Sequence, residues 1–404
     1  MPESPRTIML VATEPSATRL GAALMEAWQN VQPNVVFIGM GGAEMQARGL
    51  VQKAPAEAAA VMGLAEVIPA IPRIRKALKV LAHAVETERP ALVLTIDGQD
   101  FAARLAKATR HLGVPHVQYV APKVWAWRQG RVHSLAKLFT HILSILPFEA
   151  PFFAASGLPT TYVGHPMVSQ LAAYAQMRRT QPHSHTLALL PGSRAQEWAH
   201  HWPIMLATYR RLRQLQPTLG ALLVVPDAAA AARCRAWAPW AETEQIEVVV
   251  AEQRFAALAT CRAALAKSGT NNLELAVLGV PAVVCYRMHA LTYAVARWLV
   301  KIPYVSLPNV VINPPVMGQK GRKTGHVVYP EFIQKAVTPE NLARALVPML
   351  APKPPAYVAK GLAQVAAALE TPRPPAEMAL EIVLNLLEKP EIARGTGTQK
   401  PNKA

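Results

Sequence analysis

The stretch LVLTIDGQDF, residues 92–101, places acids directly after an apolar run. Residues 92–96 have the near-continuous apolar pattern of a strand buried on both faces, as in a parallel sheet covered by helices. Asp97 ends the run and Asp100 follows it. A carboxylate at the tip of a core strand either caps the next helix or lines a ligand site. Composition alone leaves both interpretations open.

The same pattern recurs along the chain, with strand-like runs separated by segments of helical spacing. The runs lie at 7–12, 34–42, 91–97, 114–121, 140–146 and 160–164, and again at 186–194, 221–226, 246–251, 263–270 and 281–287. Unbroken apolar strands alternating with helices are typical of parallel, doubly wound sheets. A chain of 404 residues is long enough for two such domains. The sequence therefore predicts an α/β fold of two Rossmann-like domains facing a cleft.

The expected domains are residues 1–175 and 186–350, with the polar stretch 175–186 as linker. Residues 351–390 are expected to form helices that pack back on the first domain. The tail 391–404 is polar and basic without periodicity, which predicts disorder.

The formal charge of +17, from 42 basic and 25 acidic residues, favours polyanionic partners such as nucleic acid, anionic lipid surfaces or phosphorylated substrates. The basic residues are spread, and no nucleic-acid-binding motif is present, so we expect no nucleic-acid partner. Three distant cysteines predict neither a disulfide framework nor a zinc site, and suit a reducing cytoplasm. Without a signal-peptide pattern or a long apolar run, any membrane contact is expected to be peripheral.

Two segments of the second half place small and charged residues between a strand and a helix. They are LLPGSRAQE (189–197), with Gly192, Ser193, Arg194 and Glu197, and AKSGTNNLE (266–274), with Ser268, Gly269, Thr270 and Glu274. Helix N-termini present free N–H groups to anions, and an arginine can hold a phosphate. For the first segment, simple capping by Ser193 is an equal alternative. Neither a Walker P-loop nor a dinucleotide fingerprint is present, so helix ends are the predicted phosphate site.

The segment YVAPKVWAWRQGRV (119–132) combines Trp125 and Arg128, which form either a ligand wall or a packing corner. His165 follows a strand and is either a ligand contact or a buried structural histidine. The basic amphipathic segment 67–85 predicts a helix with a solvated face or a membrane-surface helix, and the loop 318–323 has the same two options. The motifs of zinc hydrolases and serine esterases are missing.

Together these segments resemble one known family, lipid-A-disaccharide synthase, a glycosyltransferase family of the GT-B fold. The resembling segments run in the same order over nearly the whole chain: 61–67, IDGQDF (96–101), 119–132, LPFE (146–149), VGHPM (163–167), LALLPGSRAQE (187–197), 268–287, YVSLPNVV (304–311) and PEFIQ (330–334). The resemblance implies condensation of UDP-2,3-diacylglucosamine with 2,3-diacylglucosamine 1-phosphate (lipid X). The products would be the β-1,6-linked disaccharide 1-phosphate and UDP. It also implies peripheral attachment to anionic lipids on the cytoplasmic side of the inner membrane, and it allows a homodimer.

The resemblance implies roles for individual residues. Asp97 corresponds to the catalytic carboxylate that takes the acceptor proton, and Arg194 to an arginine beside the UDP diphosphate. The UDP-sugar side would include Gly192, Ser193, Glu197, Ser268, Gly269, Thr270, Glu274 and Asn309. The acceptor side would include Glu14, Ser16, Asp100, Trp125, Arg128 and His165, with Asp100 alternatively capping the helix at 102–113. The resemblance implies neither a metal nor a cofactor.

The first loop departs from the family pattern. Family members have glycines and an aspartate where this chain has Thr13, Ala17 and Thr18, whereas Glu14 and Ser16 are kept. The family aspartate, replaced here by Thr18, belongs to the acceptor side, so its loss is expected to affect acceptor binding. Two alternative functions remain: a UDP-GlcNAc 2-epimerase-like enzyme, and a non-catalytic basic protein that binds nucleotide sugars.

Overall fold

The computed structural model describes residues 6–58, 64–181 and 183–388. These residues divide into two compact units, the first within 6–166 and 371–388 and the second within 167–370. Within the described ranges, no helix combines the length and the apolar character needed to cross a membrane.

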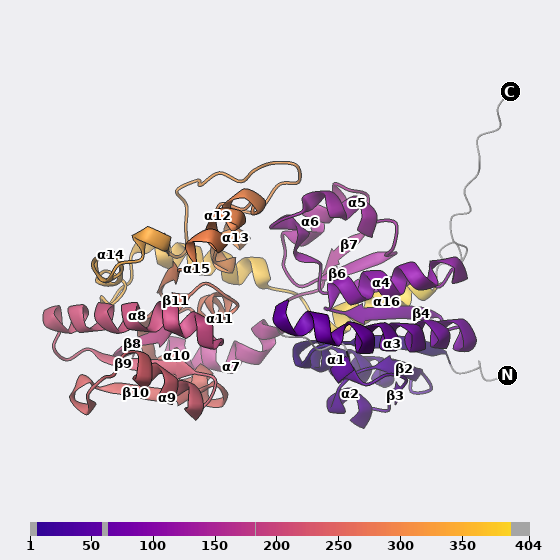
Figure 1. The fold of residues 1–404 in the computed structure, drawn as a ribbon, viewed down its shortest axis with the longest axis horizontal. Coiled ribbons are helices and arrows are strands. Elements are labelled where there is room, and N and C mark those ends of the chain that lie inside the picture. The colour runs from indigo at the N-terminus through magenta and orange to yellow at the C-terminus, as the bar shows by residue number, and fades with distance from the viewer. Residues whose placement is uncertain (1–5, 59–63, 182, 389–404) are drawn as a thin grey trace. The chain divides into compact units, whose positions relative to one another are not determined.

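Unit 1 is built on a seven-stranded parallel sheet with the order β3-β2-β1-β4-β5-β6-β7 (Figure 1). Its strands are β1 (Thr7–Ala12), β2 (Val36–Met40), β3 (Val51–Gln52), β4 (Leu92–Ile96), β5 (His116–Tyr119), β6 (His141–Ser144) and β7 (Thr160–Tyr162). β1 pairs with β2 on one side and with β4 on the other. The strand order therefore reverses between β1 and β4, where open α/β sheets usually bind ligands.

Helices cover both faces of this sheet. They are α1 (Pro15–Val31), α2 (Ala43–Ala47), α3 (Leu64–Glu88), α4 (Gln99–Thr109), α5 (Val132–Leu135), α6 (Glu149–Ala154) and α16 (Pro375–Glu388). Alternate residues of β1 serve two cores: Ile8 and Leu10 join the core of α1 and α16, while Met9 and Val11 join the core of α3 and α4. Both faces are buried, which explains the unbroken apolar strands.

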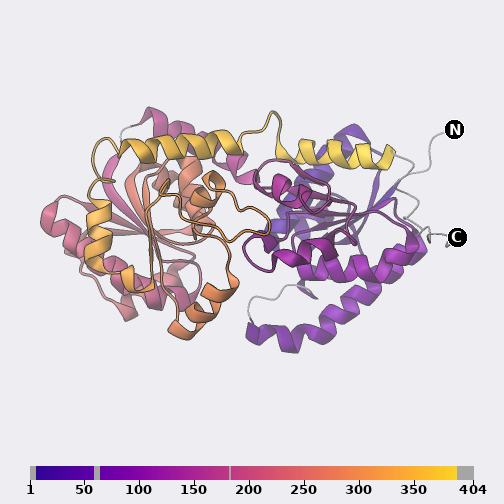
Figure 2. The same cartoon turned by 90° about the horizontal axis from the view of Figure 1, so that it is seen from above.

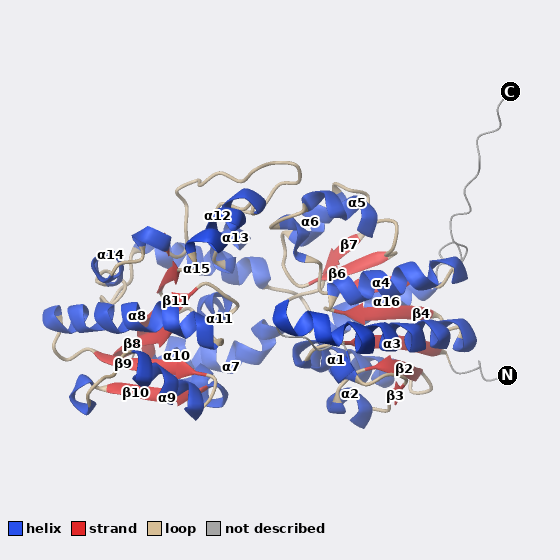
Figure 3. Cartoon of the chain, in the orientation of Figure 1, coloured by secondary structure: helices blue, strands red, loops and turns tan. Residues whose placement is uncertain are grey.

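Unit 2 repeats this plan, with helices packed around a parallel sheet (Figure 3). The sheet has six strands in the order β10-β9-β8-β11-β12-β13. Its strands are β8 (Ser184–Leu190), β9 (Gly220–Val225), β10 (Ile246–Val250), β11 (Cys261–Lys267), β12 (Ala282–Tyr286) and β13 (Glu331–Ile333). Its helices are α7 (Pro166–Thr180), α8 (Ala195–Leu215), α9 (Ala228–Trp237), α10 (Arg254–Thr260), α11 (Asn271–Leu278), α12 (Ala290–Leu299), α13 (Leu307–Ile312), α14 (Pro339–Leu346) and α15 (Ala356–Leu369). The order reverses between β8 and β11.

Two expectations about the chain's organisation need correction, and two strands were not predicted. The boundary between units lies at 166/167, because residues 175–180 continue α7 instead of forming a linker. Of the C-terminal helices, only α16 packs with unit 1, against α1, whereas α15 packs against α11 and α13 of unit 2 (Figure 2). The short strands β3 and β13 have no apolar run long enough to predict them. The tail 391–404 lies outside the described residues.

Candidate functional site

The candidate residues fall into two groups, one in each unit. In unit 2, the loops 191–194 and 268–270 follow the neighbouring strands β8 and β11, on either side of the point where the strand order reverses. Gly192 has φ 122°, and a Cβ added there would lie 2.4 Å from Glu197 Oε2. Only glycine therefore lets the chain turn this closely around the Glu197 carboxylate.

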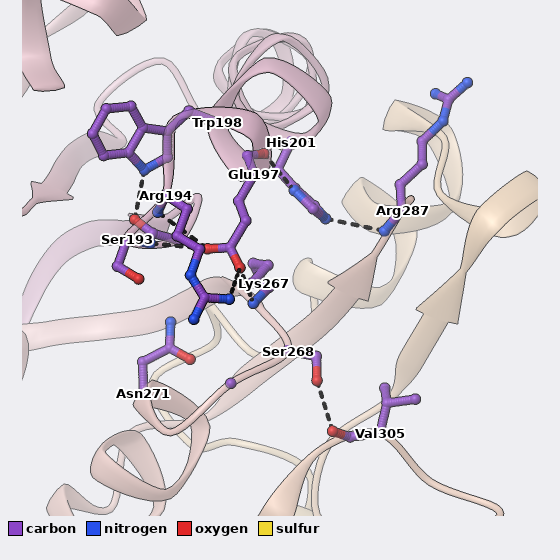
Figure 4. Close-up of polar contacts among 12 residues, drawn as sticks. Ser193, Arg194, Glu197, Trp198, His201, Lys267, Ser268, Asn271, Arg287 and Val305 are labelled. Atoms are coloured by element: carbon purple, nitrogen blue, oxygen red, sulfur yellow. Dashed lines mark hydrogen bonds and ion pairs between the residues drawn. The ribbon is translucent and has the colours of Figure 1, made fainter. Parts of the chain in front are cut away.

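Glu197, in the first turn of α8, is the centre of this group (Figure 4). Its Oε2 accepts hydrogen bonds from the backbone N–H groups of Ser193 (3.1 Å) and Arg194 (3.3 Å), and its Oε1 accepts one from Lys267 Nζ at 2.7 Å. Burial opposes ionisation of Glu197, but the Lys267 ammonium and the backbone donors outweigh it and lower the carboxyl pKa. One carboxylate thus joins the loop after β8 to the end of β11. Capping by Ser193 is wrong, because Arg194 occupies the N-cap and Glu197 reaches back to the loop.

Lys267 is a site residue that the sequence reasoning missed. It ends β11, its side chain is 14% exposed, and its Nζ lies 5.4 Å from the Tyr286 ring centroid. The ammonium is also 3.9 Å from the position that a Cβ of Gly269 would take. The available signal was a lysine that ends the apolar run directly before SGT. With Arg194, whose side chain is 79% exposed, two cations and one carboxylate meet at this loop pair.

His201 supports the same corner from inside the fold. Its Nε2 accepts from the Arg287 backbone N–H (3.0 Å), so its Nδ1 carries the hydrogen and donates to the Glu197 carbonyl (2.6 Å). Burial lowers the His201 pKa to about 4, so the ring is neutral at pH 7. The imidazole therefore acts as a fixed connector between α8 and the end of β12.

The second loop is held mainly by internal hydrogen bonds. Ser268 Oγ donates to the Val305 carbonyl at 2.6 Å, and the Gly269 N–H donates to Asn272 Oδ1 at 3.1 Å. Thr270 is exposed at the N-cap of α11. Glu274 is buried and forms an ion pair with Arg254 at 2.9 Å. Its carboxylate therefore fastens α11 to the start of α10.

The expected contact of Asn309 with a nucleotide needs correction. The residue is fully buried, and its Nδ2 donates to the Tyr329 carbonyl and to Glu331 Oε1, both at 2.8 Å. Its Oδ1 accepts from the N–H groups of Val328 and Tyr329. All the hydrogen-bonding capacity of the amide is used inside unit 2, so Asn309 positions α13 and does not face a ligand.

In unit 1, Asp97 stands at the corresponding reversal, directly after β4. Its φ is 55°, in the left-handed region that only a few residue types adopt readily. The backbone is held there by hydrogen bonds of the Asp97 N–H to the Tyr119 carbonyl (2.9 Å) and of Gln118 Nε2 to the Asp97 carbonyl (2.9 Å). Oδ1 accepts from the Gly98 N–H at 2.9 Å. These bonds fix the backbone of Asp97 and hold one carboxylate oxygen against the start of α4.

Glu14, at the end of β1, shares the electrostatic environment of Asp97. Burial and the Asp97 charge raise the pKa of Glu14, and the ammonium of Lys123 opposes them. The three groups come from the loops after β1, β4 and β5, which are neighbours in the sheet. Unit 1 thus brings two carboxylates and one cation to its own switch point. Ser16 is exposed and is the second residue of α1.

The unusual residues of the first loop are packed inside unit 1. Thr13 is buried, and a Cβ on Gly98, whose φ is 53°, would lie 2.5 Å from Thr13 Oγ1. Thr18 Oγ1 accepts from the Gly42 N–H at 3.2 Å. The Thr13 side chain therefore fills space that is open only because position 98 is glycine.

The tryptophan segment is a packing corner. Trp125 is buried, donates from Nε1 to Glu149 Oε1 at 3.0 Å, and packs edge-on against Phe148. The ligand-wall interpretation of Trp125 is therefore wrong. Arg128 is exposed and stacks on Trp127 at 4.4 Å. Glu149, which sequence reasoning did not select, also accepts from the Leu146 N–H, and burial raises its pKa to about 8.

The remaining acceptor-side candidates have separate environments. Asp100 does not cap α4, which begins at Gln99, and instead forms an ion pair with Arg131 at 2.9 Å. His165 is partly buried, which lowers its pKa to about 4. Over the ranges that the structure describes, no three His, Cys, Asp or Glu side chains are grouped so that they could hold a metal ion.

The two parallel sheets, with charged groups at both switch points, define the class of GT-B proteins. Among solved structures, a MurG from Acinetobacter baumannii matches with a TM-score of 0.56 at 15% identity, covering 94% of this chain and 100% of that chain. A UDP-GlcNAc 2-epimerase from Neisseria meningitidis matches with a TM-score of 0.56 at 11% identity, covering 95% of this chain and 100% of that chain. These likenesses show the fold.

The particular family comes from sequence comparison. The profile of the lipid-A-disaccharide synthetase family matches residues 8–373. A lipid-A-disaccharide synthase from Rhodospirillum centenum is 36% identical over 411 residues, covering 99% of both chains. One from Azotobacter vinelandii is 39% identical over 365 residues, covering 85% of this chain and 89% of the relative. The chain belongs to this family of glycosyltransferases.

Proposed function

We propose that this chain condenses UDP-2,3-diacylglucosamine with lipid X to form the β-1,6-linked lipid A disaccharide 1-phosphate and UDP. The observation that carries the mechanism is the placement of Asp97 at the switch point of unit 1, with its backbone held by Tyr119 and Gln118. Family membership supplies the substrate class.

In the proposed reaction, Asp97 accepts the proton of the acceptor 6-hydroxyl as this oxygen attacks the anomeric carbon of the donor sugar. Attack from the face opposite UDP inverts the anomeric configuration and gives the β linkage. Glu14 and Lys123 set the charge around Asp97 and the acceptor phosphate: Glu14 raises the local negative charge and Lys123 offsets it. The departing UDP takes the electron pair of the broken bond.

Unit 2 stabilises that departing charge. Arg194 and Lys267 supply cations, and the N-terminus of α8 adds its dipole. Glu197 keeps Lys267 in place by the hydrogen bond at 2.7 Å. Gly192 and Ser193 shape the loop, while Gly269 and Thr270 form the second loop of the same switch point.

The substrates carry acyl chains, so we also propose peripheral attachment to the inner membrane on its cytoplasmic side. The exposed basic residues Arg73, Arg75, Lys76 and Lys79 of α3 support it through attraction to anionic lipids. On the described part of α3, Ala77 and Leu81 are buried in the core and Leu78 packs against it, whereas Ile71 and Val80 are exposed. Attachment through α3 would therefore combine charge attraction with contact of these two apolar side chains, and vesicle binding that falls with added salt would test the electrostatic part.

The transfer reaction is tested with Asp97→Asn and radiolabelled acceptor. Asparagine tolerates the left-handed backbone at this position, so the variant removes the charge without the strain that alanine would add. Loss of the base should lower turnover about 100- to 10,000-fold. Glu26→Gln, a control at an acid with no assigned role, should change turnover less than about threefold because the ion pair of Glu26 with Arg48 is exposed.

Wild-type protein that forms no disaccharide from the authentic substrates would disprove the proposed activity. A fully active Asp97→Asn variant would disprove only the role of Asp97. Formation of UDP-ManNAc from UDP-GlcNAc would instead indicate an epimerase.

A further inference from the structure

Helix α12 of unit 2 exposes large apolar side chains. Trp298 is 84% exposed, the highest value among the large hydrophobic residues that the structure describes, and Val295 is 52% exposed. The two are three residues apart and share one helix face. Val300, just beyond the helix, is also exposed. Burying an exposed indole is favourable by a free energy on the order of 2 kcal/mol, so this face is suited to a contact outside the unit.

The sequence on both sides of α12 is basic. No aspartate or glutamate occurs between residues 275 and 330. Arg297 is exposed on α12, and Lys301 is exposed just after it. The loop at 318–323 adds three more exposed basic residues, Lys320, Arg322 and Lys323. The Gly321 N–H donates to the Lys301 carbonyl at 2.8 Å, which fixes this loop beside the end of α12. The exposed apolar face therefore has a rim of positive charge.

The same region is hollowed. A surface hollow of about 1030 Å³ is lined by Pro303, Ile312, Val316, Lys320 and Arg322, among others. Val316 is 54% exposed there. Gly321 packs so closely on Pro303 that a Cβ would lie 2.4 Å from Pro303 Cδ, so the loop is held against the chain that follows α12. Apolar and cationic groups line one hollow, as an acyl chain and its anionic headgroup require.

We propose that α12 and the loop 312–324 form a docking surface for an anionic lipid bilayer. An exposed tryptophan with flanking arginine and lysine is the combination that settles at the boundary between headgroups and acyl chains. A second copy of this face would bring like charges together, and nucleic acid would leave the apolar residues unpartnered. The inference extends the proposed function, whose acylated substrates come from a bilayer, and uses none of the residues assigned to the reaction.

The test is co-sedimentation of the full chain with phosphatidylcholine vesicles containing about one third phosphatidylglycerol. The double variant Val295→Ser, Trp298→Ser should lower the partition coefficient about tenfold. Leu215→Ser is the matched control, because Leu215 is 66% exposed on α8 of the same unit and should have no effect. Replacing Lys320, Arg322 and Lys323 by glutamine should weaken binding about fivefold per charge, and only when phosphatidylglycerol is present.

The proposal is overturned if the double variant binds these vesicles as wild type does, or if Leu215→Ser weakens binding equally. It is also overturned if the double variant changes only the oligomeric state in light scattering, which would make the face an interface between copies. Turnover of detergent-dispersed substrates should be unchanged in the double variant, and equal melting temperatures should confirm that all variants fold. Wild type without turnover would disprove the proposed reaction but not the docking surface.

Discussion

Replacement of Glu149 by glutamine should change how the stability of unit 1 depends on pH. The buried carboxyl has a pKa raised from 4.5 to about 8 by burial. The raised pKa means that the folded state binds the proton more tightly than the unfolded chain. Its contribution to stability is therefore fully present below about pH 4.5 and is lost as the pH rises through about 8.

The structure sets the expected size of this effect. Each pH unit between the two pKa values lowers the free energy of unfolding by about 1.4 kcal/mol. At acid pH the protonated carboxyl still has an oxygen facing each of the donors Trp125 and Leu146, whereas glutamine turns an NH2 group toward one of them. The variant should therefore be about 1–3 kcal/mol less stable at acid pH. The two unfolding free energies should converge as the pH rises and cross at roughly pH 6, beyond which the variant is more stable.

The comparison must be made as a difference between wild type and variant. His116 in the same unit has its pKa lowered to about 4 by burial, which makes stability rise with pH between about 4 and 6.5. This contribution is present in both proteins and cancels. Denaturant unfolding from about pH 5 to about pH 9 measures the difference. The Trp125 indole N–H resonance, assigned with Trp125→Phe, reports the ionisation directly because it donates to Glu149.

A constant difference in stability across this pH range would refute the reasoning. So would an indole resonance that titrates near pH 4.5, the ordinary value for glutamate. Either result would mean that the hydrogen-bond donors around Glu149 stabilise its charged form more than burial destabilises it.

Three further predictions concern contacts on which the site depends. Lys267→Met should weaken UDP binding about tenfold in calorimetry and leave uridine binding unchanged, because the proposed function places the ammonium against the diphosphate alone. Equal losses for both ligands would make Lys267 a structural residue. Gly98→Ala should destabilise unit 1 by about 2 kcal/mol in denaturant unfolding, because Gly98 has a φ of 53° and a Cβ there would contact Thr13. Adding Thr13→Gly should restore part of the lost stability, and no restoration would show that the contact with Thr13 does not matter. Arg178→Met should cost about 3 kcal/mol in unfolding free energy, since the buried guanidinium donates to three carbonyls, and a loss below about 1 kcal/mol would contradict this.

Several parts of the fold follow from local pattern. The first strand is predicted with the bounds that the structure has, and the runs at 221–226 and 246–251 differ from β9 and β10 by one residue at most. β3 and β13 are short and have no such pattern, since their place depends on pairing with β2 and β12. The predicted linker overlapped the end of α7. The sequence at 175–180 is mostly polar, and only a few residues of α7 are buried, so the apolar spacing of a helix is absent.

The candidate site also contains residues that the sequence predicted correctly by position and residues whose role only the packing revealed. Asp97 and Arg194 were identified from their positions after strands, and both stand at switch points of the sheets. Trp125 and Asn309 were assigned to ligands because their types suit that role, but their polar atoms are satisfied by Glu149 and by Tyr329 and Glu331. A residue type indicates what a side chain can bind, and its surroundings decide whether that capacity is still available.

The sequence by itself determined the alternation of strands and helices, the presence of two sheets and the family, because apolar periodicity and motif order are properties of neighbouring residues. Only the tertiary structure decided which distant groups meet. Lys267 reaches Glu197 across seventy residues, and Thr13 occupies the space left by Gly98. Trp298 is exposed although its helix is apolar enough to be buried. Burial and pairing depend on the whole chain's packing, so no local pattern contains them.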